Sequence, residues 1–290
     1  MQDIPYFQKK EQIILPEEYK KYKCCFVIAS FNNEHNVKYN IGSIINQDYD
    51  NWRIIYVNDA STDKTEAILF DIIDEYNIQD KITYIKNETN MHQAYSKYQA
   101  YQILENDEIC IILDGDDWLS SSNVLSIIVN SYNAHDCLMT YSKMLSIVNN
   151  TSRIDYYGLY PYQVKYTGDY RATKKWYFSH LRTGLSKLFK NIPKDYLIME
   201  GEWLDRATDM AELLCIAEMA QERVYFINEV LCVYNYNNSK KYKSSYYNDK
   251  NSNKRKTILN YIYNCKKLNP YTINYVNLPA YIIHLSHDIH

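Results

Sequence analysis

The chain has few of the residues that interrupt regular structure, with only six glycines and six prolines among its 290 residues. Its apolar content is too high for a disordered protein, since 46% of its residues are apolar and 23% are charged. This composition indicates a globular protein. A chain of this length can bury one substantial core, or one core with a small appendage.

The sequence has no excess of positive charge. Lysine and arginine total 32 against 35 for aspartate and glutamate, which leaves a formal net charge of −3. Proteins that bind nucleic acid broadly neutralise its phosphates with a basic face, and this balance argues against such a face. We therefore expect no nucleic-acid partner.

No segment has the length and apolarity of a membrane-directed element. The opening residues, MQDIPYFQKKEQ, lack the apolar core of a signal peptide, and no stretch reaches the roughly eighteen apolar residues that span a bilayer. The seven cysteines form no CxxC pairs with zinc-like spacing. An odd number of cysteines without a secretion signal predicts reduced, mostly buried thiols. We expect a cytoplasmic protein without a transmembrane segment.

The first half of the chain does contain a regular alternation of apolar runs and amphipathic stretches. Apolar runs predict buried strands, and apolar residues at helical spacing predict helices between them. The predicted strands are 24–29, 53–57, 82–85 and 108–113, and the predicted helices carry residues 37–45, 69–76 and 94–104. This order is typical of right-handed βαβ units, which give a parallel sheet covered on both faces.

Two acidic loops follow strands of this predicted sheet. Residues 58–63 come directly after the second strand, and residues 114–117 come directly after the fourth. In open α/β sheets, ligands bind at the carboxyl edge of the strands. We therefore expect both loops to share one crevice.

The second half of the chain is less regular. Residues 237–256 are polar and rich in Lys, Asn and Ser, which is typical of a linker or mobile loop. The remaining segments predict strands at 137–141 and 224–236, the latter paired, and helices at 174–190, 208–221 and 257–268.

Three segments in a fixed order carry a resemblance to a known family. They are SFNNE at 30–34, SIINQDY at 43–49 and VNDASTD at 57–63. Their order and spacing resemble the opening of the family 2 inverting glycosyltransferases, over residues 23–120 and more weakly as far as 236. The resemblance implies a GT-A fold, which is an α/β, Rossmann-like and mostly parallel sheet with helices on both faces.

We accordingly predict three parts of the chain. Residues 1–22 form an N-terminal extension, and residues 23–236 form the GT-A glycosyltransferase domain. Residues 237–290 form a Lys/Asn-rich loop and a small helical C-terminal extension.

The resemblance also implies which residues bind the nucleotide. Asp59 takes the position that recognises uracil, where a carboxylate accepts a hydrogen bond from the N3–H group. Ala29, Phe31 and Glu34 take the positions of further nucleotide contacts. Asn58 stands where the family has the first aspartate of a pair, a substitution that keeps polarity but removes charge.

Asp114, Gly115, Asp116 and Asp117 resemble the DxD signature of the family. A sugar diphosphate carries two or more negative charges, which a hard cation with oxygen ligands offsets. We expect Mn²⁺ or Mg²⁺ at this turn, with Asp116 as its ligand, Asp114 as a further candidate, and Asp114, Gly115 and Asp116 in contact with the donor. An acidic turn by itself is more often only solvated. Its place after the fourth strand and the Asp59 loop favours the functional reading.

An acidic residue opens the helix predicted at 208–221. Asp209 follows Ala207 and Thr208, at a place where the family carries an acidic residue. An inverting transfer needs a base that takes the proton of the acceptor hydroxyl, and Asp209 is our candidate. An aspartate at this position can instead cap its helix, and the two roles are compatible.

Further candidates bear on the phosphates and the acceptor. Trp176, His180 and Arg182 resemble residues that line the donor–acceptor boundary in some family members, and the planar fork of Arg182 suits phosphate. His180 is a candidate for binding pyrophosphate, orienting an acceptor or completing the metal shell. A histidine satisfied at a surface or interface is the alternative. Relatives often carry a Gly and an Arg-Asn pair after the third strand, whereas this chain has His92 and Lys97, and Lys97 is our candidate phosphate contact there.

Together with these residues, the resemblance implies a metal-dependent inverting glycosyltransferase that moves a hexose or N-acetylhexosamine from a UDP-sugar to an acceptor hydroxyl. The sugar, the acceptor (a glycan, a protein or a lipid) and the oligomeric state stay open. A non-catalytic nucleotide-sugar-binding protein of the same fold is the alternative, motivated by Asn58 and the altered loop at 90–98. A nucleotidyltransferase is disfavoured, because those enzymes usually show a Gly-rich basic loop where this chain has SFNNE.

Overall fold

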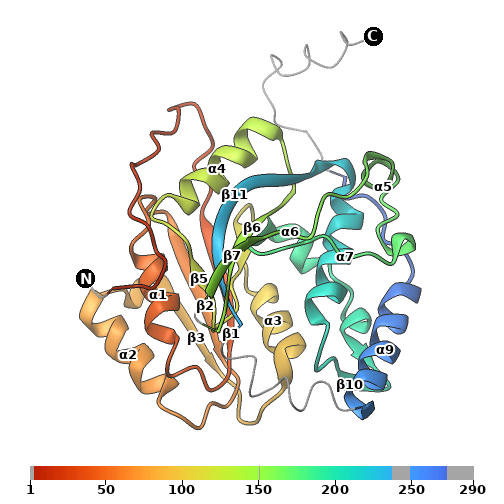
Figure 1. Cartoon of the computed structure of the whole chain (residues 1–290), viewed down its shortest axis with the longest axis horizontal. Coiled ribbons are helices and arrows are strands. Elements are labelled where there is room, and N and C mark those ends of the chain that lie inside the picture. The colour runs from red at the N-terminus through yellow and green to blue at the C-terminus, as the bar shows by residue number, and fades with distance from the viewer. Residues whose placement is uncertain (1–2, 150, 237–248, 273–290) are drawn as a thin grey trace.

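The computed structural model describes residues 3–149, 151–236 and 249–272 (Figure 1). Within these ranges nine strands form one sheet in the order β3-β2-β1-β4-β8-β6-β11-β5, with β7 paired to β6. Helices α1 and α2 lie on one side of the sheet, and α3, α6 and α7 lie on the other (Figure 1). The predicted α/β fold with a mostly parallel sheet is confirmed.

The bounds of the elements are as follows. The strands of the large sheet are β1 (Cys24–Ser30), β2 (Trp52–Asn58), β3 (Ile82–Lys86), β4 (Ile109–Ile112), β5 (Trp118–Leu119), β6 (Met139–Val148), β7 (Thr151–Asp155), β8 (Arg182–Leu185) and β11 (Val224–Asn235), and a separate pair is formed by β9 (Ile198–Met199) and β10 (Glu202–Trp203). The α-helices are α1 (Val37–Ile45), α2 (Thr65–Tyr76), α3 (His92–Gln102), α4 (Val124–His135), α5 (Tyr162–Thr167), α6 (Ser186–Lys190), α7 (Thr208–Ala220) and α9 (Asp249–Asn264).

The parallel half of the sheet brings strand ends together at one edge. β1 pairs in parallel with both β2 and β4, and β2 pairs in parallel with β3. The side chains of β1 are almost all buried, as expected for a central strand covered on both faces. Ser30, the last residue of β1, lies opposite Asn58, the last residue of β2. The loops that follow these strands therefore leave the sheet side by side.

The prediction of a helix over 174–190 is wrong for most of that range. Residues 182–185 instead form β8, which inserts between β4 and β6 and is antiparallel to both. All four of its residues are buried, because both neighbours supply hydrogen-bond partners and both faces are covered. Only residues 186–190 are helical, as α6. Tertiary pairing here overrides a helix-like apolar pattern.

The C-terminal helix begins earlier than predicted. α9 starts at Asp249, whereas the sequence predicted a loop to residue 256 and a helix at 257–268. Ile258 and Ile262, four residues apart, are buried against the main body, and Arg171 Nη1 donates a hydrogen bond to the Ile262 carbonyl at 2.6 Å. This packing stabilises helix α9, although the composition of its first residues is typical of a loop. The rest of the predicted loop and extension, 237–248 and 273–290, lies outside the described residues.

The N-terminal segment packs against the main body of the protein. The N-terminal segment runs along the loop after β5, where Gln8 exchanges backbone hydrogen bonds with Ser120 and Ser122, and Trp118 Nε1 donates to the Pro5 carbonyl. Among the described helices, none combines the length and apolarity that crossing a bilayer requires. All seven cysteines are free thiols, and six of them are buried.

Candidate active site

The loops after β1, β2 and β4 meet at the carboxyl edge of the sheet. The Asp59 backbone N–H donates to the Ser30 carbonyl at 2.9 Å, which joins the first two loops. Glu34 is joined to the second loop as well, because its N–H donates to Asp63 Oδ2 and its Oε2 accepts from the Lys64 N–H, both at 3.1 Å. Ala29 and Phe31, at the end of β1, are both partly exposed beside this edge.

Asp59 is buried and held at one of its two carboxylate oxygens. Oδ1 accepts hydrogen bonds from Asn87 Nδ2 at 2.7 Å and from the Met91 N–H at 2.8 Å. Among the described residues, Oδ2 has no hydrogen-bond partner. The carboxylate is therefore fixed in direction with one oxygen still able to accept a bond.

The hydrogen bonds of Asn58 explain why an asparagine suits this position. Its Oδ1 accepts from the Ser61 N–H at 2.9 Å, and its Nδ2 donates to the Tyr84 hydroxyl at 2.9 Å. Tyr84 in turn donates to Glu66 Oε1 at 2.7 Å. An aspartate would lack the amide donor of this chain, so the asparagine suits its local partners.

Gln93 connects the acidic turn to the helix that carries Asp209. Its Nε2 donates to Asp114 Oδ1 at 2.8 Å, and its Oε1 accepts from Thr208 Oγ1 at 2.7 Å. Gln93 stands in the first turn of α3, two residues after Met91, whose N–H binds Asp59. The start of α3 thus touches all three acidic regions. No sequence motif singles out Gln93, because Asp114 and Thr208 are 21 and 115 residues away along the chain.

The acidic turn packs tightly against the end of β1. A Cβ on Gly115 would lie 2.7 Å from Asn33 Nδ2 and 2.9 Å from Ser30 Oγ, so only glycine fits without a shift. Asn40, buried on α1, donates through Nδ2 to the carbonyls of Asp114 at 3.0 Å and Asp117 at 2.7 Å. The turn is held from both sides, and its carboxylates are positioned by the fold.

The carboxylates of the turn differ in their electrostatics. Burial raises the pKa of Asp116 to about 7, and the charge of Asp114 adds to this shift. Burial opposes the charge of Asp114 too, but the positive charges of Lys97 and Arg182 hold the pKa of Asp114 below its ordinary value. A pair of partly buried carboxylate oxygens whose charges repel each other is the donor set that hard divalent cations take. The residues present therefore fit Mn²⁺ or Mg²⁺.

Lys97 lies behind the turn and is fully buried. Its Nζ is 3.5 Å from Asp114 Oδ1 and 3.7 Å from Glu212 Oε2. Burial disfavours the charge of Lys97, but Glu212 and then Asp114 raise its pKa. Burial raises the pKa of Glu212 to about 7, against the opposing effect of Lys97. Lys97 therefore supports Asp114 from inside, and Glu212 on α7 is a partner to which no motif pointed.

Asp209 lies at the start of α7 with Arg182 beside it. Asp209 Oδ2 is 3.3 Å from Arg182 Nη2, and its Oδ1 accepts from the Met210 N–H at 2.9 Å. Arg182 is buried, donates through Nε to the Phe178 carbonyl at 3.0 Å, and stacks on the ring of Trp176. About a third of the Asp209 side chain is exposed. Trp176, Arg182 and Asp209 therefore form one cluster, with the carboxylate at its accessible end.

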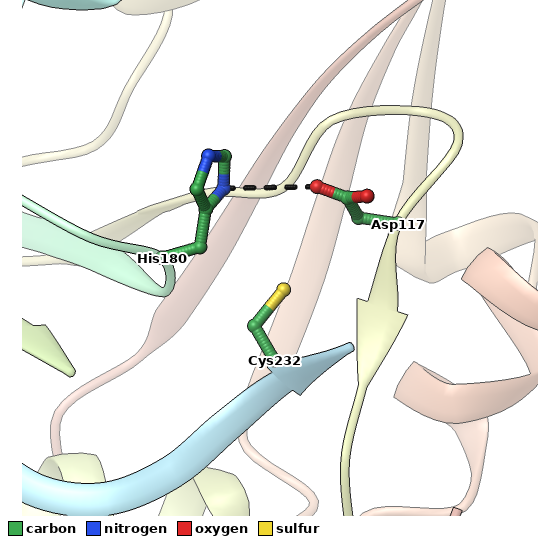
Figure 2. Close-up of side chains that lie close together, drawn as sticks. All are labelled: Asp117, His180 and Cys232. Atoms are coloured by element: carbon green, nitrogen blue, oxygen red, sulfur yellow. Dashed lines mark ion pairs between the residues drawn. The ribbon is translucent and has the colours of Figure 1, made fainter. Parts of the chain in front are cut away.

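His180 faces Asp117 and not the solvent. Its Nδ1 lies 3.6 Å from Asp117 Oδ2, and Cys232 of β11 lies close to both (Figure 2). Burial, and then the charge of Arg182, hold the pKa of His180 well below its usual value. Burial and the charges of Asp116 and Asp114 raise the pKa of Asp117. The alternative of a surface histidine is excluded by this buried position.

Comparison with known proteins adds to these observations. The sequence matches the family described as "Glycosyl transferase family 2" over residues 25–192. It is 35% identical over 95 residues to a Bacillus subtilis (strain 168) protein named "Putative glycosyltransferase EpsE", and this match covers 33% of each chain.

Two solved structures have a similar fold. The first is S. aureus TarS 1-349 in complex with UDP-GlcNAc, with a TM-score of 0.56 and 18% identity over 73% of this chain and 58% of that chain. The second is the mannosyltransferase PcManGT from Pyrobaculum calidifontis in complex with GDP-Man and Mn²⁺, with a TM-score of 0.50 and 16% identity over 78% and 60% of the two chains. At these identities the likeness shows the fold alone. The family match covers more than half of the chain, and this protein therefore belongs to glycosyltransferase family 2.

Proposed function

We propose that the protein is a metal-dependent, inverting glycosyltransferase that moves a hexose or N-acetylhexosamine from a UDP-sugar to an acceptor hydroxyl. The observation that carries the proposal is the start of α3, where the Met91 N–H binds Asp59 and Gln93 joins Asp114 to Thr208. This arrangement holds the Asp59 carboxylate, the acidic turn and the Asp209 helix around one edge of the sheet. Each part suits a different portion of a nucleotide-sugar reaction.

Donor binding begins at Asp59. Its Oδ2 is available to accept the uracil N3–H, while Oδ1 is already occupied by Asn87 and Met91. Ala29, Phe31 and Glu34 lie at the end of β1 and in the loop after it, which is hydrogen-bonded to the Asp59 loop, and they are proposed to contact the nucleoside. TarS, which shares the fold, has been crystallised with UDP-GlcNAc, which supports a UDP-sugar as the first donor to test.

Asp116 and Asp114 are proposed to hold Mn²⁺ or Mg²⁺ against the donor diphosphate. When bound, such an ion offsets the charge that collects on the departing nucleotide. Lys97 stabilises the charge of Asp114 from the buried side of the turn. Because Lys97 is fully buried, we assign it this supporting role in place of a direct phosphate contact. Gly115 lets the turn approach β1, which keeps both carboxylates at the sheet edge.

Asp209 is proposed to act as the base. The acceptor oxygen attacks the anomeric carbon, the bond from that carbon to the diphosphate breaks, and Asp209 takes the acceptor proton. Arg182 holds the orientation of the carboxylate, and Trp176 offers an aromatic face beside it. His180 lies deeper, against Asp117, and we assign it no contact with the acceptor.

A non-catalytic nucleotide-sugar-binding protein remains the second candidate. The loop at 90–98, which departs from the family pattern, is its main support. The loop nevertheless supplies Met91 and Gln93 to the contacts described above, and Asn58 is matched to Tyr84 and Ser61. These contacts weaken the case for a lost activity.

The test is release of the nucleoside diphosphate from a panel of donors with Mn²⁺ or Mg²⁺, with EDTA and Asp116→Ala as controls. The panel includes UDP-glucose, UDP-galactose, UDP-N-acetylglucosamine and GDP-mannose, since a mannosyltransferase of similar fold binds GDP-Man. We expect release from one UDP-sugar that needs the metal and is absent in the variant. Release from GDP-mannose alone would overturn the UDP proposal.

A result without any release requires a binding measurement. Calorimetric titration of UDP, with and without Mn²⁺, separates the two candidates. Binding without release, in the presence of a broad set of acceptor sugars, supports the non-catalytic protein. Absence of UDP binding with and without Mn²⁺ would contradict both the transferase and the non-catalytic binding protein.

A further inference from the structure

Three buried side chains with different ligand atoms converge beside the acidic turn. Asp117, His180 and Cys232 each direct one ligand atom to the same place, and these atoms all lie within 4.8 Å of one another. They come from the turn before β5, from the segment before β8 and from β11. Figure 2 shows the Cys232 side chain pointing toward the gap between the imidazole and the carboxylate. The long separations in sequence explain why no zinc-like spacing is visible there.

One oxygen of the Asp117 carboxylate is hydrogen-bonded, and the other lacks a hydrogen-bond partner among the described residues. Oδ1 accepts from the Asn235 N–H at 2.9 Å, whereas the buried Oδ2 has no hydrogen-bond partner among the described residues. His180 Nδ1, at 3.6 Å, is too far for a hydrogen bond. A buried carboxylate oxygen without a partner is costly, and a positive group bound between Asp117 and His180 would remove that cost.

The separation between the two atoms suits a shared metal ion. Nitrogen and oxygen ligands that each lie about 2.0–2.2 Å from a tetrahedral Zn²⁺ are separated by roughly 3.3–3.6 Å. The observed 3.6 Å between His180 Nδ1 and Asp117 Oδ2 falls at the end of that range. The thiol of Cys232 lies within 4.8 Å of both atoms, and a sulfur ligand of the same tetrahedral ion would lie roughly 3.6 Å from them.

We propose that Asp117, His180 and Cys232 form a zinc site distinct from the donor-metal site at Asp114 and Asp116. Thiolate and imidazole ligands favour Zn²⁺, whereas carboxylates alone favour Mg²⁺ or Mn²⁺. Three protein ligands leave one position of a tetrahedral zinc for water. The site would tie β11 and the segment before β8 to the acidic turn. None of the contacts among these three residues depends on glycosyl transfer.

The burial of the ligands has a consequence for metal exchange. All three side chains are at most about one-twentieth exposed, so the ion should enter during folding and leave slowly. Binding also releases the thiol proton of Cys232, because the ligand is the thiolate. We therefore expect the zinc to resist dialysis against EDTA under conditions that remove a donor-bound Mn²⁺.

The experiment uses the full chain, produced with added zinc and dialysed against EDTA. Zinc content is measured by mass spectrometry, and a sample refolded with Co²⁺ is examined for a thiolate-to-cobalt charge-transfer band. The variants are Cys232→Ser, the matched control Cys110→Ser on buried strand β4, and Asp116→Asn. Circular dichroism checks that each variant is folded.

We expect nearly one zinc per chain in the wild type, the Cys110 variant and the Asp116 variant, and loss of zinc in the Cys232 variant. The absence of retained zinc and of a thiolate band in the wild type would overturn the proposal, and this result needs no variant to fold. Unchanged zinc in Cys232→Ser, or loss of zinc in Asp116→Asn, would also overturn a separate site. Donor turnover is assayed independently, so failure of the zinc site and failure of the proposed transferase are distinguishable.

Discussion

Arg182 Nη2 lies 3.3 Å from Asp209 Oδ2, in a pair whose arginine is buried and whose carboxylate is partly open. The guanidinium is held in turn by the Phe178 carbonyl and by the ring of Trp176. Because the arginine is fixed by these contacts, the carboxylate next to it has a defined direction. Asp209 is thus positioned by β8, a strand whose neighbours are far away in sequence.

The role of Asp209 as a base predicts a selective loss of turnover. Replacing Asp209 with Asn keeps size and polarity but removes the proton acceptor, so we expect kcat to fall about 10²–10⁴-fold. The dissociation constant for UDP should change little, because Asp209 is not proposed to contact the nucleotide. Steady-state kinetics and UDP titration measure both. A matched control is Asp205→Asn, whose carboxylate pairs with Arg206 and Lys254, and equal turnover in the two variants would contradict the assignment.

The bridge made by Gln93 predicts a positioning effect. Gln93→Ala removes its hydrogen bonds to Asp114 and Thr208, so the acidic turn and α7 lose their link. We expect kcat/KM to fall about tenfold, which equals ~1.4 kcal/mol and is of the size of one or two hydrogen bonds. Metal affinity, measured by Mn²⁺ titration in the presence of UDP, should weaken in parallel. Gln102→Ala, at the exposed end of the same helix, should leave both unchanged, and an equal effect there would refute the bridge.

The buried charge of Lys97 predicts a large loss of stability. Lys97→Met keeps most of the side-chain volume but leaves Glu212 and Asp114 without their cation. Removing one partner of a buried ion pair costs about 3–5 kcal/mol, which urea unfolding measures. Lys86→Met breaks the more exposed pair with Glu66 and should cost at most about 1 kcal/mol. Similar costs for the two variants would mean that Lys97 is not charged in the folded chain.

The contacts of Asp63 predict a dependence of stability on pH. Burial opposes its charge, but hydrogen bonds from the Thr65 side chain and N–H, and from the Glu34 N–H, hold the pKa of Asp63 below its ordinary value of 3.8. The folded chain binds this proton less tightly than the unfolded chain. The stabilisation is therefore complete above pH 3.8 and is lost as the pH falls below that value.

Replacing Asp63 with Asn tests this effect. We expect a loss of ~1 kcal/mol at pH 7, the usual size of a side-chain bond to the first turn of a helix. The difference in melting temperature from the wild type should narrow as the pH is lowered from 5 to 3. Asp71→Asn, at an exposed position on α2, serves as the control. A difference in melting temperature that widens as the pH falls would show that folding does not lower the pKa of Asp63.

Local pattern was sufficient for the first half of the fold. The strands that became β1, β2, β3 and β4 are continuous apolar runs, and each is followed by the polar loop that the topology requires. Because parallel strands end at one edge, the positions of the Asp59 loop and the Asp114 turn follow from strand order alone. No side-chain contact had to be known for that inference.

Local pattern failed where partners are distant. Residues 182–185 have no signal that separates them from a helix, and they are a strand because β4 and β6 leave a gap between them. Gln93 and Glu212 are ordinary helical residues in the sequence, and they gain their roles from contacts with Thr208, Asp114 and Lys97. Residues 249–256 are polar enough for a loop, yet they begin a helix whose later turns dock on the main body.

The sequence by itself determined the α/β class, the order of the first strands and the edge at which the acidic loops emerge, because these depend on periodicity and on chain direction. Only the tertiary structure decided which side chains meet there. The link from Gln93 to Asp114, the pairing of Arg182 with Asp209 and the convergence of Asp117, His180 and Cys232 join residues that lie 21 to 115 positions apart. Such contacts are set by the packing of whole elements, and no local run of residues encodes them.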